Sequence, residues 1–299
     1  MKQHEMAIQP LTPATNTAVL VTTLLLKQID QVQEAAAIRH FVAQLPLLVK
    51  SLRLRHPTSQ LQITIGFGAA AWRRLFPQAP QPPALTTFQA VKGSHYTAPA
   101  TAGDLLLHLR SSSPAVVYAA QMQCQALLTA VTTSLEETTG FRYFNGRTLL
   151  GFLPEVTNPP AAKVLLTHKA APFQGGSYVL LQKYIHKMAA WQQLSAQKQA
   201  AIYGLHQQTG LPLPKADPPA HWSLTQSQHP ILRLHVPYAA QGVSGTLQLR
   251  YARNPNWLQQ VSAQAVQQDD PLLAYTVPIS GSFFFVPAPQ LLTKLGRGH

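Results

Sequence analysis

The chain has 299 residues, of which 46% are hydrophobic and 11% are charged. This length and apolar content suffice for one large domain or two of ordinary size, and they exclude an intrinsically disordered chain. The formal net charge is +13, from 23 basic and 10 acidic residues, but the basic residues are scattered along the sequence. The charge therefore favours an anionic small molecule as a partner over nucleic acid.

The single cysteine, Cys124, excludes an internal disulfide and a cluster of cysteine metal ligands. No apolar run reaches the roughly 18 residues of a membrane span, so no membrane association is expected. The first long apolar run, Ala18 to Leu26, follows a polar lead containing Glu5 and lacks the features of a signal peptide. We therefore expect a cytoplasmic protein.

The first half of the chain alternates between strand-like and helix-like patterns. Apolar residues of the longest helical segment recur near i, i+3, i+4 and i+7, and Pro46 is expected to kink or interrupt that helix. Ser113 and Pro114 are typical of the start of another helix. The expected strands are 16–26, 61–68, 103–111 and 140–144, the expected helices are 30–53, 70–76 and 113–131, and 77–99 is expected to be a loop.

The second half repeats this alternation. Its expected strands are 175–186, 229–238, 245–253 and 281–287, and its expected helices are 187–206 and 254–268. Each half thus has the order β-α-β, β-α-β, which predicts an α+β fold of two ferredoxin-like halves, each an antiparallel sheet with helices packed on one face. Glycine and proline near the middle of the chain place the boundary between a half of residues 1–146 and a half of residues 147–299.

Few residues are candidates for chemistry. The ten acidic residues include no pair suited to two-carboxylate catalysis and no acid-rich metal loop. Among the histidines, His186 lies in an apolar segment and is expected to be structural. His221 follows two prolines, and Arg233 and His235 lie two apart on one strand, so their side chains share a face. An edge strand with its polar side in water is the alternative interpretation of that pair.

Five segments, in this order, resemble the dye-decolorising peroxidase family, in particular its shorter bacterial cytoplasmic members. They are TIGFGAAAWRRLF, GDLLLHLRS, GFRYFNGRTLLGF, GGSYVLLQKYIHKMAAW and GSFFFVPAPQLL. The resemblance implies a peroxidase with haem b as cofactor, hydrogen peroxide and a small electron donor as partners, and assembly into a homo-oligomer. It also implies the dimeric α+β barrel type of fold.

The resemblance also implies roles for particular residues. His221 matches the proximal histidine that binds the haem iron, and Arg233 matches the distal arginine, which would stabilise charge on a bound peroxide or contact a haem propionate. Asn158 keeps its place in the loop around the haem and is expected to help bind the cofactor.

The same loop departs from the family pattern. Gly151 and Phe152 are retained, but Pro154 stands in the position of the aspartate that shuttles protons, and Glu155 takes the place of the following glycine. A proline side chain neither accepts nor donates a proton, so the loss of this general acid-base would cost about 10²–10⁴-fold in rate. Glu155 could replace the aspartate by swinging its longer side chain toward the haem.

His235 stands where the family usually has a small polar residue. Three interpretations remain open: it restores acid-base chemistry beside Arg233, it is a second iron ligand, or it points into an altered pocket. In a second departure, Ala274 falls near the position where many members place an acidic partner of the proximal histidine, which predicts a less electron-donating imidazole. The functional hypotheses are a haem peroxidase, a catalytically weak haem store, carrier or sensor, and an interaction scaffold without haem.

Overall fold

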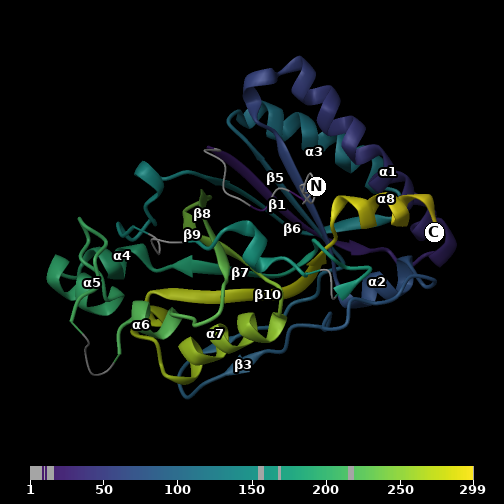
Figure 1. Ribbon diagram of the computed structural model, residues 1–299. Helices are drawn as coiled ribbons and strands as arrows, with labels where there is room; N and C mark the ends of the chain where they lie inside the picture. Colours follow the sequence, from purple (N-terminus) through teal and green to yellow (C-terminus); the bar gives the residue numbers. More distant parts are fainter. Residues whose placement is uncertain are drawn as a thin grey trace, which may run out of the picture.

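The computed structural model describes residues 9, 11, 17–153, 158–167, 170–214 and 219–298 (Figure 1). The strands of the main sheet are β1 Ala18–Leu26, β2 Gln62–Phe67, β5 Leu105–Ser111, β6 Thr132–Phe141, β7 Ser177–His186, β8 Leu232–Ala240, β9 Val243–Ala252 and β10 Thr276–Val286. The helices are α1 Gln31–Arg55, α2 Ala69–Leu75, α3 Pro114–Leu128, α4 Met188–Gln192, α5 Ala196–Tyr203, α6 His221–Thr225, α7 Pro255–Gln267 and α8 Pro289–Arg297.

Within these residues, the eight long strands form one antiparallel sheet in the order β6-β1-β5-β2-β10-β7-β9-β8. Each half contributes four neighbouring strands, and in both halves the spatial order is fourth, first, third, second. This is the ferredoxin-like order, so the expected α+β fold of two ferredoxin-like halves is confirmed. The division of the chain at residue 146 stays a prediction.

The two edges of the sheet approach each other, so the sheet curls like a barrel. Across this approach, the Lys183 ammonium on β7 lies 2.6 Å from a carboxylate oxygen of Glu136 on β6 and donates to Thr138 Oγ1 at 2.9 Å. Strands β6 and β8 are also in contact. The interior is a core to which both halves contribute, with buried residues that include Val21, Leu106, Val179, Val236, Leu249 and Phe284.

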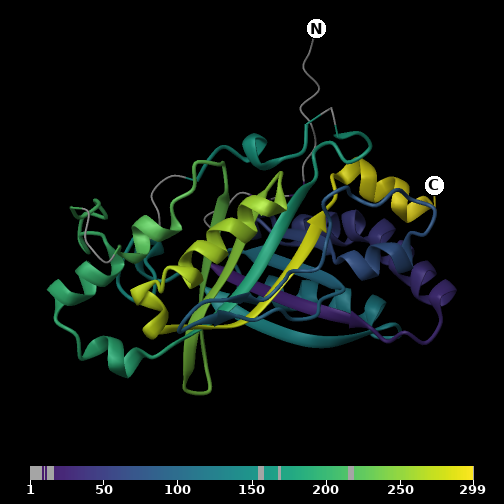
Figure 2. The same ribbon diagram turned by 90° about the horizontal axis from the view of Figure 1, so that it is seen from below.

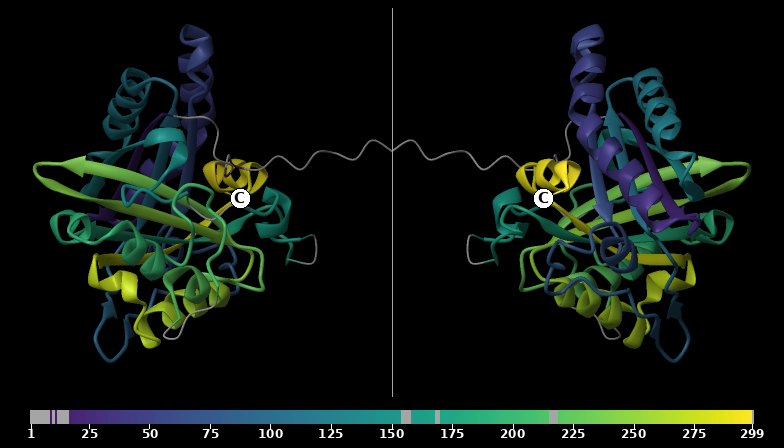
Figure 3. Two further views of the ribbon diagram at one scale, coloured as in Figure 1. Left: turned by 90° about the vertical axis from the view of Figure 1, so that its left-hand side faces the viewer. Right: turned by 90° about the vertical axis from the view of Figure 1, so that its right-hand side faces the viewer.

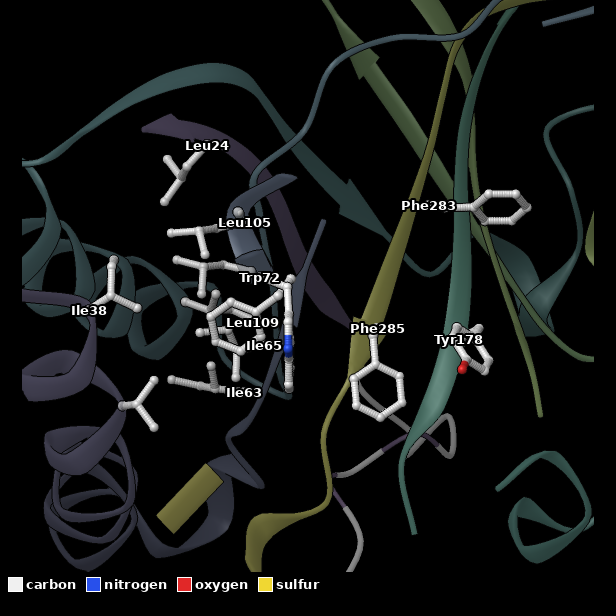
Figure 4. Close-up of a cluster of buried hydrophobic side chains, with 14 of the residues drawn as sticks. Leu24, Ile38, Ile63, Ile65, Trp72, Leu105, Leu109, Tyr178, Phe283 and Phe285 are labelled. Carbon is white, nitrogen blue, oxygen red and sulfur yellow. The ribbon is translucent and has the colours of Figure 1, made fainter. Parts of the chain in front are cut away.

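Helices cover the outer faces of the sheet. Helices α1, α3 and α8 lie on one side of the molecule, and α6 and α7 lie on the opposite side (Figures 1 and 3). Helix α7 runs along β7 and β9 (Figure 2). Under the first group of helices lies the largest core, in which the Trp72 and Phe285 rings meet edge to face at 5.7 Å between centroids, joining the two halves (Figure 4).

Several expected elements differ from the structure. The last strand of the first half starts at Thr132 and not at residue 140. Its first part lacks the apolar pattern of a strand because this edge strand is rich in threonine and glutamate. The helix expected over 187–206 is two helices, since Ser195 caps the start of α5. Helix α1 runs through Pro46 without interruption, and the expected loop 77–99 contains the short strands β3 Val91–Lys92 and β4 Thr97–Ala98.

In the part of the chain that the structure describes, no helix is both long enough and apolar enough to span a membrane.

Candidate functional site

The outer face of the second half carries polar side chains on neighbouring strands. On β8, Arg233 and His235 alternate with buried leucines and valine, so both point to the outer face. Their cross-strand partners on β9 are Arg250 and Gln248, respectively. Residues directly opposite one another in an antiparallel pair share a face, so the four side chains lie together. The predicted pairing of Arg233 with His235 on one face is therefore part of a larger polar surface.

A hydrogen-bond network holds Arg250 in place. Arg250 is 6% exposed, and its guanidinium donates from Nη1 to Gln182 Oε1 on β7 at 3.0 Å and from Nη2 to Gln248 Oε1. Gln182 donates in turn to Ser262 Oγ on α7 at 3.2 Å. These bonds compensate the cost of burying a cation and fix its position in the sheet.

His221 is the first residue of the short helix α6, which faces this surface. Its Nδ1 atom lies 2.6 Å from Oδ2 of Asp270, a carboxylate that is 1% exposed. The other carboxylate oxygen, Oδ1, accepts from the backbone N–H of Leu272 at 2.9 Å and caps the 3₁₀ helix η5, Pro271–Ala274. The imidazole therefore donates its Nδ1–H to Asp270, which leaves Nε2 as the nitrogen available to a ligand.

This pair corrects one expectation from the sequence. Ala274 was expected to leave His221 without a carboxylate partner, but the carboxylate of Asp270 pairs with His221. Ala274 belongs to the helical turn that Asp270 caps, four residues further along the chain. The available signal was the Asp-Pro step of Asp270 and Pro271, which is typical of a capped helix start.

Two adjoining cavities lie between α6 and the sheet, with about 380 and 520 Å³ of empty space, open solvent included. Both are lined by His221, His235 and Arg250. Other residues common to the two cavities are Tyr203, Thr225 and Gln248. The structure thus brings His221, Arg233 and His235 to the walls of one region, with Arg233 in the smaller cavity.

Arg233 bridges the sheet and α6. Its Nη2 donates to the carbonyl oxygen of Thr225, at the end of α6, at 2.9 Å. Asn158 does not line either cavity; its side chain pairs with the backbone of Arg233, accepting from its N–H at 2.7 Å and donating to its C=O at 2.8 Å. Asn158 therefore anchors the strand that carries Arg233.

Two histidines in the cavity walls are held neutral. Burial, and then the positive charges of Arg250 and Arg233, lower the pKa of His235 to about 3. Burial lowers the pKa of His186 to about 4, and this side chain lines the larger cavity. His186 was expected to be structural, and its sequence context gave no sign of its place in the cavity wall.

The loop that opens the second half reaches the site through aromatic contacts. Phe152 is fully buried and stacks on Tyr203 at 4.1 Å between ring centroids, and Tyr203 lies edge-on to His221 at 5.3 Å. Arg147 donates to the carbonyl oxygen of Gly151 at 2.8 Å, which fixes the turn at that glycine. Pro154 and Glu155 lie outside the described residues.

The chemistry of these residues fits haem. A single imidazole backed by a carboxylate is a common protein ligand of haem iron. The two arginines of the walls can meet anionic groups such as propionates. Apolar contacts for a planar ring come from Leu150, Leu205, Leu272 and Leu273. The fold and these residues together define an α+β protein with a polar, carboxylate-backed histidine site whose chemistry suits haem.

Comparison with known proteins identifies the family. The family model described as Dyp-type peroxidase, N-terminal, matches residues 9–142, and its C-terminal counterpart matches residues 145–290. A dye-decolorizing peroxidase of Mycobacterium tuberculosis is 30% identical over 95% of this chain and 88% of that protein. One from Rhodococcus erythropolis is 31% identical over 95% of this chain and 87% of its own length.

Solved structures agree. A dye-decolorizing peroxidase from Bacteroides thetaiotaomicron has a TM-score of 0.91 at 31% identity, covering 98% of this chain and 99% of the other. A variant of DypB from Rhodococcus jostii RHA1 in complex with heme has a TM-score of 0.90 at 27% identity, covering 97% and 99% of the two chains. The chain belongs to the dye-decolorising peroxidase family, whose members bind haem.

Proposed function

We propose that the protein is a haem-dependent peroxidase that oxidises small organic donors or dyes with hydrogen peroxide. The observation that carries the proposal is the pair of His221 and Asp270 facing, across one region, a wall that contains Arg233, His235 and Arg250. Haem iron, when bound, supplies the centre that reacts with peroxide. The residues of this chain bind it, orient it and manage charge and protons around it.

His221 is the proposed iron ligand, through Nε2. Asp270 accepts the proton of Nδ1 and fixes both the tautomer and the orientation of the ring. Because the carboxylate is almost fully buried and also caps η5, it is positioned by the fold before any ligand arrives. It also gives the imidazole more anionic character, which would make His221 a more electron-donating ligand.

His235 is the proposed acid-base group in place of the family's aspartate. Its pKa of about 3 leaves the imidazole unprotonated at neutral pH and thus in the form that can accept a proton from peroxide. The same low pKa makes it a weak base, so the proton that it accepts is readily passed on. Arg233 and Arg250 stabilise the negative charge that remains on the peroxide oxygen. His235 on β8 then replaces the proton-accepting aspartate whose position Pro154 occupies. Glu155 is a further candidate for the same acid-base role.

Peroxide turnover by His235 variants tests this assignment. Haem-loaded protein should oxidise an anthraquinone dye with hydrogen peroxide, and His235→Ala should reduce kcat/KM for peroxide by about 10²–10⁴-fold, the usual contribution of a general acid-base. His229→Ala is the matched control, because His229 stacks on Trp257 outside the two cavities. An unchanged rate in His235→Ala would remove His235 from the mechanism.

A haem-binding protein with little turnover is the second candidate. This candidate is favoured because two imidazoles that could each bind iron, those of His221 and His235, line the same two cavities. If both bind iron, no position is left for peroxide. A low-spin ferric spectrum that becomes high-spin in His235→Ala would support this candidate, whereas a high-spin wild type supports the peroxidase.

Cytoplasmic location and assembly into a homo-oligomer complete the proposal. They are supported by the sequence and by relatives, one of which is described as an encapsulated DyP-type peroxidase of Mycobacterium smegmatis. Light scattering of the purified protein tests the oligomer directly.

A further inference from the structure

A third cavity lies in the first half of the chain, between α3 and the outer face of β1, β5 and β6. It holds about 790 Å³ of empty space, open solvent included. Its floor is formed by the apolar residues Leu24, Leu107, Leu109, Cys124 and Leu128, each 7% exposed or less. Threonine, serine and glutamine side chains dominate its rim. The cavity itself has a volume of about 280 Å³, close to the lower end of the range of small-molecule sites. An apolar floor with a few polar groups at the rim is also typical of such sites.

Hydrogen bonds hold α3 to its surroundings on both sides of the cavity. On one side, the Gln121 amide donates to the carboxylate of Glu137 on β6. On the other, Thr132 Oγ1 donates to the carbonyl oxygen of Leu128 at 3.0 Å, and Lys27 Nζ donates to that of Thr129 at 2.7 Å. Because α3 is tied at both places, the space over Cys124 is kept open by the fold.

This cavity is the counterpart of the candidate haem site. Each half has the same strand order. The cavity in the first half lies beneath α3 on β1, β5 and β6, and the larger cavity of the candidate haem site lies beneath α6 on the corresponding strands β7, β9 and β10 and on β8. The lining differs in chemistry. The site in the second half contains His221, Asp270 and Arg250, whereas none of the described residues that line the cavity in the first half is a histidine.

Charge also argues against an ionic or metal-bound occupant. The lining carries one cation and one carboxylate, and both already donate or accept hydrogen bonds within the rim. Burial raises the pKa of the Cys124 thiol to about 12, so the floor is neutral at physiological pH. The side chains that line an empty apolar cavity lack van der Waals contacts on one side, and an apolar ligand would supply these contacts.

We propose that this cavity binds a small uncharged molecule, mainly apolar and bearing a hydroxyl group. The apolar body lies against the leucines and Cys124, and the hydroxyl bonds the threonine and glutamine rim. This site is separate from the haem site, so the proposal does not depend on peroxide turnover.

Isothermal titration of haem-loaded protein with 1-naphthol, without peroxide, tests the proposal. The wild type should bind one equivalent. Cys124→Phe fills the floor and should weaken binding by at least about tenfold. Gln125→Trp should do the same from an exposed rim position that is tolerant of change, which keeps the test valid if the first variant does not fold. Gln123→Trp, on the same helix but outside the lining, is the matched control and should bind as the wild type does.

Three outcomes would overturn the proposal. The first is that 1-naphthol shows no saturable binding to the wild type. The second is that Cys124→Phe and Gln125→Trp both bind it with the affinity of the wild type. The third is that removal of haem abolishes binding while Gln125→Trp leaves binding intact. A fourth would reassign the surface: no naphthol binding, together with a wild-type dimer that Gln125→Trp dissociates, would show that a second copy of the chain covers this face.

Discussion

Oδ2 of Asp270 lies 2.6 Å from Nδ1 of His221, and the same carboxylate caps the 3₁₀ helix that follows it. The position of the proposed iron ligand therefore depends on a residue 49 positions away, held by its own local turn. This relationship makes the carboxylate, and not the histidine alone, the feature that sets the properties of the site.

Asp270→Asn should weaken the site without unfolding it. The amide retains an oxygen for the N–H of Leu272 but removes the negative charge beside the imidazole. We expect a loss of about 10–100-fold in peroxidase activity, the usual effect of removing a partner of a metal ligand, and a rise in the iron reduction potential. Asp269→Asn is the control, because that neighbour contacts His95 instead. An unchanged potential in Asp270→Asn would contradict the role given to the carboxylate.

Arg250→Met should impair peroxide chemistry although Arg250 is not the family's distal arginine. The variant keeps an unbranched, flexible side chain but removes the cation that faces His235 and bonds Gln182 and Gln248. Loss of one such charge-stabilising donor costs about 10²–10³-fold in kcat. Arg253→Met, whose cation lies over Trp257 and outside the cavities, should retain activity. Steady-state kinetics in peroxide decide the matter, and equal rates for the two variants would exclude Arg250.

Asn158→Ala should loosen the strand that carries Arg233. It deletes two hydrogen bonds to the Arg233 backbone, each with a net value of about 0.5–1.5 kcal/mol. Because these bonds are exposed, we expect the free energy of unfolding to fall by about 1–2 kcal/mol in urea denaturation of the haem-free protein. Asn256→Ala, on the exposed side of α7, should change it by less than about 0.5 kcal/mol. A decrease in the free energy of unfolding as small as that of Asn256→Ala would mean that other contacts hold the backbone of Arg233 in place.

His186 should make the haem-free protein less stable in acid. Its folded pKa of about 4 lies below the ordinary value of 6.5, so between these values the unfolded chain binds more protons than the folded one. Its contribution is therefore fully present above pH 6.5 and declines as the pH falls toward 4.

His186→Gln removes this titration. Between pH 7 and pH 5 the variant should lose about 2 kcal/mol less of its free energy of unfolding than the wild type, from the 1.36 kcal/mol that each pKa unit represents. Urea denaturation at the two pH values gives the comparison. Parallel losses in both proteins would show that His186 is already protonated or solvated in the folded state.

The sequence predicted the parts of this molecule that follow from periodicity. Alternation along one strand correctly placed Arg233 and His235 on a common face, and the order of strands and helices gave the ferredoxin-like halves. The same alternation in β9, combined with its antiparallel pairing to β8, places Arg250 on this face as well.

Other features depend on contacts between distant segments. The partnership of Asp270 with His221 and the binding of Asn158 to the Arg233 backbone join residues 49 and 75 positions apart. The local sequence marks Asp270 as the start of a helical turn, but it does not show which distant residue either side chain contacts. Strand β6 was predicted too short for a different reason, because an edge strand with exposed threonine and glutamate lacks the apolar run that marks a strand.

Haem titration of the wild type and of His221→Ala tests the central claim most directly. We expect the wild type to take up one equivalent of haem with a Soret band typical of histidine ligation, and His221→Ala to lose that band or to bind haem with a clearly altered spectrum. Uptake by His221→Ala with the spectrum of the wild type would contradict the account, because iron would then be held by some other residue.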